Sequence, residues 1–184
     1  MPLDVGMGIL LAIFVSRTGL LPLSAAAVAA GILFSLLPDL DFLLHLARQG
    51  TGRFSHEHRD LLHNPLVFIP AGTIFLAFMN GGLALLFALS AIAHFLHDSV
   101  GMGWGVRWAY PFSKKYYKFF SDPNGHASRR FLVSWTPDAQ RAAAAEFGDP
   151  HWLSDYLKLS REFLIELGVL AAALILLFAA GFRI

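Results

Sequence analysis

The sequence predicts an all-α fold: an integral membrane bundle of four to five short apolar helices with a polar layer at its cytoplasmic side. The 184-residue chain is 56% hydrophobic and only 15% charged, whereas soluble domains carry about 25% charged residues. Its apolar segments are longer than strands and rich in Ala and Leu, which favours helices. A full span needs about 20 apolar residues, and several segments are shorter, so both four and five spans stay open.

Five apolar segments follow one another along the chain, at residues 5–16, 24–37, 65–79, 82–98 and 162–182. The turn signals RTGLLP (17–22) and NGG (80–82) separate the first pair and the middle pair. No Lys or Arg precedes the first segment, so it is interpreted as a retained helix and not as a signal peptide. We therefore predict a membrane-embedded core over 1–112, an interfacial or cytoplasmic loop over 113–161 and a C-terminal transmembrane helix over 162–184.

The positive charges predict the orientation of this bundle. With five alternating helices, the loops 39–64 and 99–161 share one side of the membrane. That side holds all Lys and Arg residues except Arg17 and Arg183. The positive-inside rule then places both loops in the cytoplasm, which predicts a multi-pass protein of the inner (plasma) membrane. The net charge is +1, so no basic footprint for nucleic acid is present.

The chain contains eight histidines and no cysteine. Any bound metal must therefore be held by nitrogen and oxygen atoms, a donor set that suits zinc, manganese, iron or magnesium.

Polar residues gather at the ends of three neighbouring apolar segments. PDLD (38–41) follows the second segment, HEHRDLLHN (56–64) precedes the third and AHFLHDSV (93–100) ends the fourth. Pro38 should end the second helix at Leu37, and the non-helical turn after it lets Asp39 and Asp41 aim at one point. His94 and Asp98 share one face of a helix.

Each polar cluster alone is compatible with a solvated helix end or loop. Because the three segments alternate in direction, however, these ends meet at one membrane face. Carboxylate and neutral imidazole are the ordinary ligands of divalent ions, so we predict a site for one or two ions, zinc or manganese by preference. Its predicted ligands are Asp39, Asp41, His58, His63, His94 and Asp98.

These motifs resemble the YdjM-like family of membrane-bound, metal-dependent hydrolases, also described as LexA-binding and inner membrane-associated. The family pattern Pro-Asp-x-Asp, His-Arg-x-x-x-His and His-x-x-x-Asp, with a Gly-containing stretch and Pro-Phe after it, is matched by PDLD, HRDLLH (58–63), HFLHD (94–98), GMGWGVRW (101–108) and PF (111–112). The chain departs from the pattern at Asn64, where Ser is usual, and at Asp4, where an early His is common. The resemblance covers about residues 1–112 and implies hydrolysis without naming a substrate.

The predicted function is metal-assisted hydrolysis of an ester or phosphoester, with a lipid as the suggested substrate because the site lies at the membrane face. A metal ion would lower the pKa of a bound water, Asp41 or Asp98 would accept its proton, and Arg59 would bind a phosphate oxygen. Membrane lipids are the expected partners. The main alternative is a non-enzymatic metal-binding or metal-transport protein, and a scaffold stapled by metal is a third interpretation.

Outside this layer the sequence predicts a short helix in TPDAQRAAAAEFG (136–148), capped by Thr136 and ended by Gly148. KKYYKFF (114–120) is interpreted as an anchor to lipid headgroups. His126 and His151 are expected to be exposed to solvent. Further candidates for the site, or for its surroundings, are Asp4, His45, His56 and His97.

Overall fold

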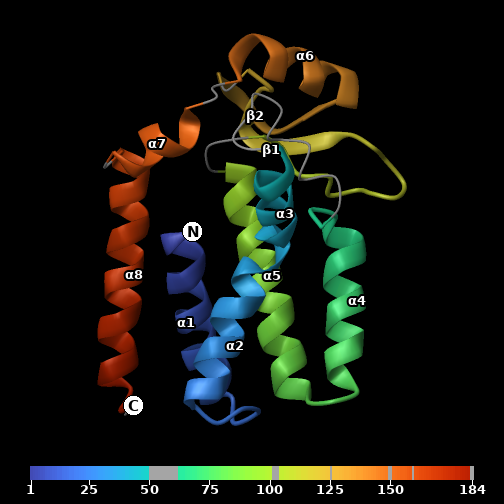
Figure 1. Cartoon of the computed structure of the whole chain (residues 1–184). Helices are drawn as coiled ribbons and strands as arrows, with labels where there is room; N and C mark the ends of the chain where they lie inside the picture. The colour runs from blue at the N-terminus through green and yellow to red at the C-terminus, as the bar shows by residue number, and fades with distance from the viewer. Residues whose placement is uncertain (50–61, 101–103, 125, 149–150, 159, 183–184) are drawn as a thin grey trace. The chain divides into compact units, whose positions relative to one another are not determined.

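The protein is described here from a computed structural model, which covers residues 1–49, 62–100, 104–124, 126–148, 151–158 and 160–182. Its elements run in the order α1 (Pro2–Arg17), α2 (Ala25–Leu36), the 3-10 turn η1 (Leu37–Asp39), α3 (Leu40–Gln49), α4 (Pro65–Ala77), α5 (Gly81–Val100), β1 (Tyr116–Ser121), β2 (Ala127–Trp135), α6 (Pro137–Phe147), α7 (Trp152–Leu157) and α8 (Arg161–Ala179) (Figure 1). The chain forms two compact units. The first contains residues 1–38, 69–94 and 154–184, and the second contains 39–68 and 95–153.

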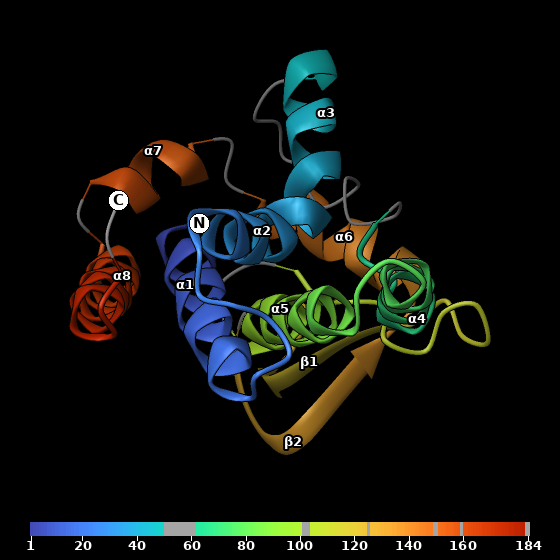
Figure 2. The same cartoon turned by 90° about the horizontal axis from the view of Figure 1, so that it is seen from below.

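The first unit is built around α1, which packs against both α2 and α8 (Figure 2). Its core is apolar and includes Ile9, Val15 and Leu86, all nearly inaccessible to solvent. Gly8 and Gly31 allow α1 and α2 to approach closely, since a Cβ on Gly8 would lie 2.5 Å from the carbonyl oxygen of Gly31. Small residues at such crossings are typical of helices that associate in a membrane.

Three described helices are long and apolar enough to cross a membrane: Ala25–His45, which includes η1 and part of α3, Gly81–Val100 and Arg161–Ala179. α4 is a shorter apolar helix. The predicted apolar segments thus all fall on helices, with bounds within a few residues of those expected. The structure supports three spans by length and composition, and the four to five spans remain a prediction.

Pro38 does not produce the non-helical turn that the sequence predicted. α2 ends at Leu36, residues 37–39 continue as a 3-10 turn, and α3 begins at Leu40. A 3-10 turn accommodates the proline, because Pro lacks only the N–H donor that the first turn of a new helix does not need. Asp39 therefore lies in the turn and Asp41 in the first turn of α3.

The second unit contains an antiparallel hairpin, so the prediction of an all-α chain is wrong there. β1 pairs with β2, with Tyr116 opposite Trp135 and Phe119 opposite Leu132. Two aromatic-rich runs around the turn sequence DPNG (122–125) were the signal for it. Tyr116 and Lys118 are buried, so they cannot serve as headgroup contacts, whereas Lys114 and Lys115 are exposed.

α6 confirms the predicted short helix. Thr136 caps it by accepting a hydrogen bond from the Ala139 N–H, and the chain leaves the helix at Gly148. The indole of Trp135 donates to Oε1 of Gln140 at 2.6 Å, and both side chains are buried. This bond fastens α6 to the end of β2. α3 and α7 were not predicted, so the described helices outnumber the four to five apolar helices and the one short helix that the sequence indicated.

Candidate metal centre

His63 is the most enclosed member of the predicted site, with none of its surface exposed. It lies just before α4, where Asn64 and Pro65 are also buried. Its ring packs edge-on against Phe95 of α5, with 5.8 Å between the ring centroids. The imidazole is therefore held in a fixed orientation by apolar contact, and its two nitrogens face different polar partners.

The Nδ1 atom of His63 lies 3.1 Å from Oδ2 of Asp41. The same carboxylate oxygen accepts a hydrogen bond from the Leu62 backbone N–H at 2.9 Å. Asp41 thus binds both the backbone before His63 and the ring itself. This is the arrangement in which a carboxylate fixes the tautomer and direction of a metal-binding histidine.

The Nε2 atom of His63 faces two further carboxylates. Oδ2 of Asp98 lies 3.2 Å away and Oδ1 of Asp39 lies 3.7 Å away. If the ring hydrogen is on Nδ1, toward Asp41, then Nε2 directs a lone pair to the same region as two carboxylates. Three such acceptors in one place are stabilised by a cation.

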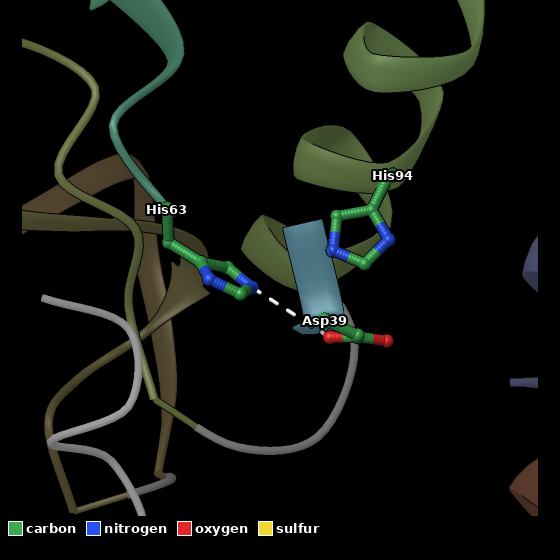
Figure 3. A group of neighbouring side chains, drawn as sticks. All are labelled: Asp39, His63 and His94. Atoms are coloured by element: carbon green, nitrogen blue, oxygen red, sulfur yellow. Dashed lines mark ion pairs between the residues drawn. The ribbon is translucent and has the colours of Figure 1, made fainter. Parts of the chain in front are cut away.

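His94 repeats this pattern on α5. Its Nδ1 lies 3.0 Å from Oδ1 of Asp4, and both residues are buried. The other oxygen of Asp4 lies 3.1 Å from the amino group of Met1. Figure 3 shows one ring nitrogen of His94 turned toward Asp39 and His63, and the other turned away. The nitrogen that is turned away is the one bonded to Asp4, so Nε2 is directed to the site.

Asp39, His63 and His94 together could hold a metal ion. Each offers one ligand atom, and these atoms all lie within 4.8 Å of one another. Asp98 lies one helical turn beyond His94 on α5, and its contact with His63 Nε2 brings it to the same nitrogen as Asp39. The donor set of imidazole nitrogens and carboxylate oxygens fits zinc or manganese.

The six ligands predicted from sequence thus divide into groups. Asp39, His63 and His94 converge, Asp98 adjoins them, and Asp41 contacts the far nitrogen of His63. His58 and the predicted phosphate-binding Arg59 lie outside the described residues, as does His56. Asp4, which the sequence suggested as a further ligand, contacts the far nitrogen of His94 instead.

Two of the remaining histidines lie where the sequence placed them, while a polar cluster went unpredicted. His126 and His151 are exposed, and His126 lies beside Asp122 in the hairpin turn. His45 is buried on α3, and His97 is half-buried on α5.

The unpredicted cluster surrounds Glu166, a carboxylate in the apolar helix α8 that accepts a hydrogen bond from the Tyr156 hydroxyl at 2.5 Å. An acid within an apolar segment was the signal for it.

Comparisons with known proteins agree with the resemblance carried by the motifs. No curated protein and no solved structure matches the chain. The sequence profile of the YdjM inner membrane protein family matches residues 4–182, which is nearly the whole chain. The match extends through the hairpin and the C-terminal helix, well beyond residues 1–112. The chain therefore belongs to the YdjM inner membrane protein family.

Proposed function

We propose that this protein is a membrane-bound, metal-dependent hydrolase that cleaves an ester or phosphoester of a membrane lipid at the cytoplasmic face of the inner membrane. The observation that carries the proposal is the convergence of Asp39, His63 and His94, whose ligand atoms lie within 4.8 Å of one another. Metal sites commonly combine carboxylate and imidazole ligands with further carboxylates, each bonded to the far side of an imidazole.

The residues of this chain would divide the work. Asp39, His63, His94 and Asp98 would hold one or two divalent ions, zinc or manganese, while Asp41 and Asp4 keep the two rings in place. A divalent ion supplies Lewis-acid chemistry, lowering the pKa of water and polarising the scissile group. Asp98 is better placed than Asp41 to accept a proton, because Asp41 already accepts from the Leu62 N–H and contacts Nδ1 of His63. Arg59 is assigned to bind the negative charge of a phosphate group.

The location of the site on helices of membrane-spanning length supports a lipid as the substrate. The site residues of α2–η1–α3 and α5 lie on or at the ends of helices of membrane-spanning length. A soluble substrate would reach such a site only at the membrane surface, whereas a lipid is already there. The alternative, a protein that binds or transports metal without hydrolysis, shares the metal site. The two are separated by assay, since only the hydrolase releases a lipid product.

The first test is metal content. After reconstitution with zinc or manganese, the purified wild type should carry stoichiometric metal by elemental analysis. His94→Ala and Asp98→Asn should lose most of it, while His126→Ala, which alters an exposed histidine of the hairpin turn, should retain it. Absence of stoichiometric metal in the wild type, or equal content in His94→Ala and wild type, would refute the site.

The second test is hydrolysis. Phospholipid vesicles incubated with the loaded protein should yield a new lipid species by mass spectrometry, and a chelator should abolish it. If metal is bound and metal uptake into vesicles occurs without any lipid product, the transport alternative is correct.

A further inference from the structure

An apolar groove of about 280 Å³ lies within the second unit. One wall comes from the hairpin and the other from the start of α4 and the segment before β1. Its lining residues are Leu66, Trp108, Ala109, Tyr117, Phe119 and Leu132. Tyr117, Phe119 and Leu132 lie on one face of the hairpin, because Phe119 is two residues from Tyr117 and pairs with Leu132.

The groove is joined to the metal centre by direct contacts. The indole N–H of Trp108 donates to Oγ of Ser99 at 2.7 Å, and Ser99 directly follows Asp98. Phe95 lies between the two sites, because its ring contacts Trp108 on one side and His63 on the other, with centroid separations of 6.3 and 5.8 Å. A molecule in the groove is therefore separated from the His63 ring by two aromatic side chains, Trp108 of the lining and Phe95 behind it.

The hairpin and the segment before β1, which contribute to the groove, also carry exposed aromatic rings and positive charge. Phe112, Phe120 and Phe131 are largely exposed, and Phe120 and Phe131 contact each other edge-to-face. Arg130 is exposed on the same strand as the groove residue Leu132, two positions away. Aromatic rings beside cations are the composition that binds the headgroup layer of a bilayer, and cations favour anionic headgroups.

We infer that this groove binds the hydrocarbon chain of an anionic phospholipid and so presents that lipid's head to Asp39, His63 and His94. The inference rests on the proposed function and specifies its substrate class. Binding pockets that enclose a whole drug-sized ligand measure about 300–1,000 Å³, so the groove holds one segment of a chain and leaves the remainder in the bilayer. The apolar lining accepts the chain, and the exposed Lys114 and Lys115, which lie just before the groove residue Tyr117 in the chain, favour a negative head.

The test uses the full-length protein in vesicles of phosphatidylglycerol that contain a phosphatidylglycerol with a photoactivatable diazirine in one acyl chain. After illumination, labelled residues are mapped by mass spectrometry. With the diazirine near the glycerol end, labelling should concentrate on residues 104–119, on β2 and on the start of α4. With the diazirine at the methyl end, labelling there should fall at least several-fold, because the distal carbons stay in the bilayer.

Leu132→Trp fills the groove and should reduce that labelling at least fivefold. Leu164→Trp on α8 is the matched control, since Leu164 and Leu132 are exposed to nearly the same extent, 51% and 48%, and it should leave the groove labelling unchanged. Ala109→Leu blocks the groove from the opposite wall and replaces Leu132→Trp if that variant does not fold. Excess unlabelled phosphatidylglycerol should compete better than phosphatidylcholine.

Several outcomes would overturn the inference. These are labelling spread evenly over the apolar helices, labelling unchanged in both groove variants, and equal competition by the two lipids. Metal content is measured on the same samples. Groove labelling without metal would refute the proposed function and leave the groove as a lipid site. Stoichiometric metal without groove labelling would refute the groove and leave the metal centre.

Discussion

Asp41 contacts the Nδ1 atom of His63, the nitrogen that faces away from the other acids of the site. This relationship changes the role that the sequence assigned to Asp41. As a ligand it would share the ion with Asp39, whereas in this position it would orient the imidazole of His63 toward the proposed ion. The same division recurs at His94, where Asp4 takes the far nitrogen. In both described histidines of the site, the Nδ1 atom thus contacts a carboxylate that can orient the ring, although Asp41 lies in α3 and Asp4 in α1.

The first prediction distinguishes the two acids of the PDLD motif. Asp41→Asn should weaken metal affinity about 10–100-fold, the usual effect of losing a residue that orients a metal-bound histidine. Asp39→Asn should weaken it more, because a ligand charge is lost. Metal titration followed by competition with a chelator measures both. Asp138→Asn, which alters a fully solvated acid of α6, is the control and should match wild type. Equal effects of Asp41→Asn and Asp39→Asn would mean that both acids are ligands, as the sequence alone suggested.

The sequence predicted the elements whose signals are local. Thr136, Pro137 and Gly148 specify α6 within a few residues, and long runs of Ala and Leu specify the apolar helices. The hairpin was missed because an aromatic and cationic run beside an apolar segment is also typical of a membrane interface. Its strands are stabilised by pairing such as Tyr116 with Trp135, which is a contact between residues far apart in the chain.

The candidate site could be predicted as a set of residues but not as an arrangement. Alternating helix direction sufficed to bring the ends of α2, α4 and α5 to one level, since that argument needs only topology. Which nitrogen of His63 each acid approaches depends on the 3-10 turn at Pro38. This turn places Asp39 and Asp41 on different sides of the ring, and no periodicity in the sequence predicts it.

The second prediction concerns the crossing of α1 and α2. Gly8→Ala should destabilise the first unit by about 1–3 kcal/mol, the typical cost of overpacking, because the new methyl group would lie 2.5 Å from the Gly31 carbonyl oxygen. Gly168→Ala on α8 is the matched control. Nothing lies within 4 Å of its new methyl group, so this variant should be neutral or gain up to about 1 kcal/mol from helix propensity. Thermal unfolding in detergent measures both, and equal melting temperatures would show that the helices do not meet at Gly8.

The third prediction concerns Tyr156. Burial, and then the hydrogen bond to Glu166, raise the pKa of its phenol above the ordinary value of 10.0. Because the folded state holds the proton more tightly, this stabilisation is present below about pH 10 and is lost as the pH rises further. In a spectrophotometric titration, the difference between wild type and Tyr156→Phe should show one tyrosine ionising later in the folded protein than in the denatured protein. Coincident curves would contradict the contact.

Tyr156→Phe also tests the contribution of that bond at neutral pH. Losing a single hydrogen bond that is partly accessible to solvent should cost about 1 kcal/mol of unfolding free energy. The loss should disappear above the folded-state pKa, where the wild-type phenol is ionised beside the carboxylate. A pH-independent difference in stability between the two proteins would assign the effect to packing instead.

The last prediction concerns orientation, on which the choice of a cytoplasmic lipid substrate depends. α5 contains 20 residues, and at about 1.5 Å per residue it is long enough to cross the hydrocarbon core. Met79, before α5, and Lys115, after it, should therefore lie on opposite sides of the membrane. Since almost all Lys and Arg residues belong to the loops on the side of Lys115, the positive-inside rule assigns that side to the cytoplasm.

The chain has no cysteine of its own, so single cysteines can be labelled without background. A membrane-impermeant maleimide applied to cells with a permeabilised outer membrane should label Met79→Cys. It should label Lys115→Cys only after the inner membrane is opened. Phe112→Cys, at a site that is 88% exposed, should behave like Lys115→Cys and controls for the loss of a charge. Labelling of Lys115→Cys with the inner membrane intact would place the metal centre on the outer side, and the substrate would then be a lipid of the outer leaflet.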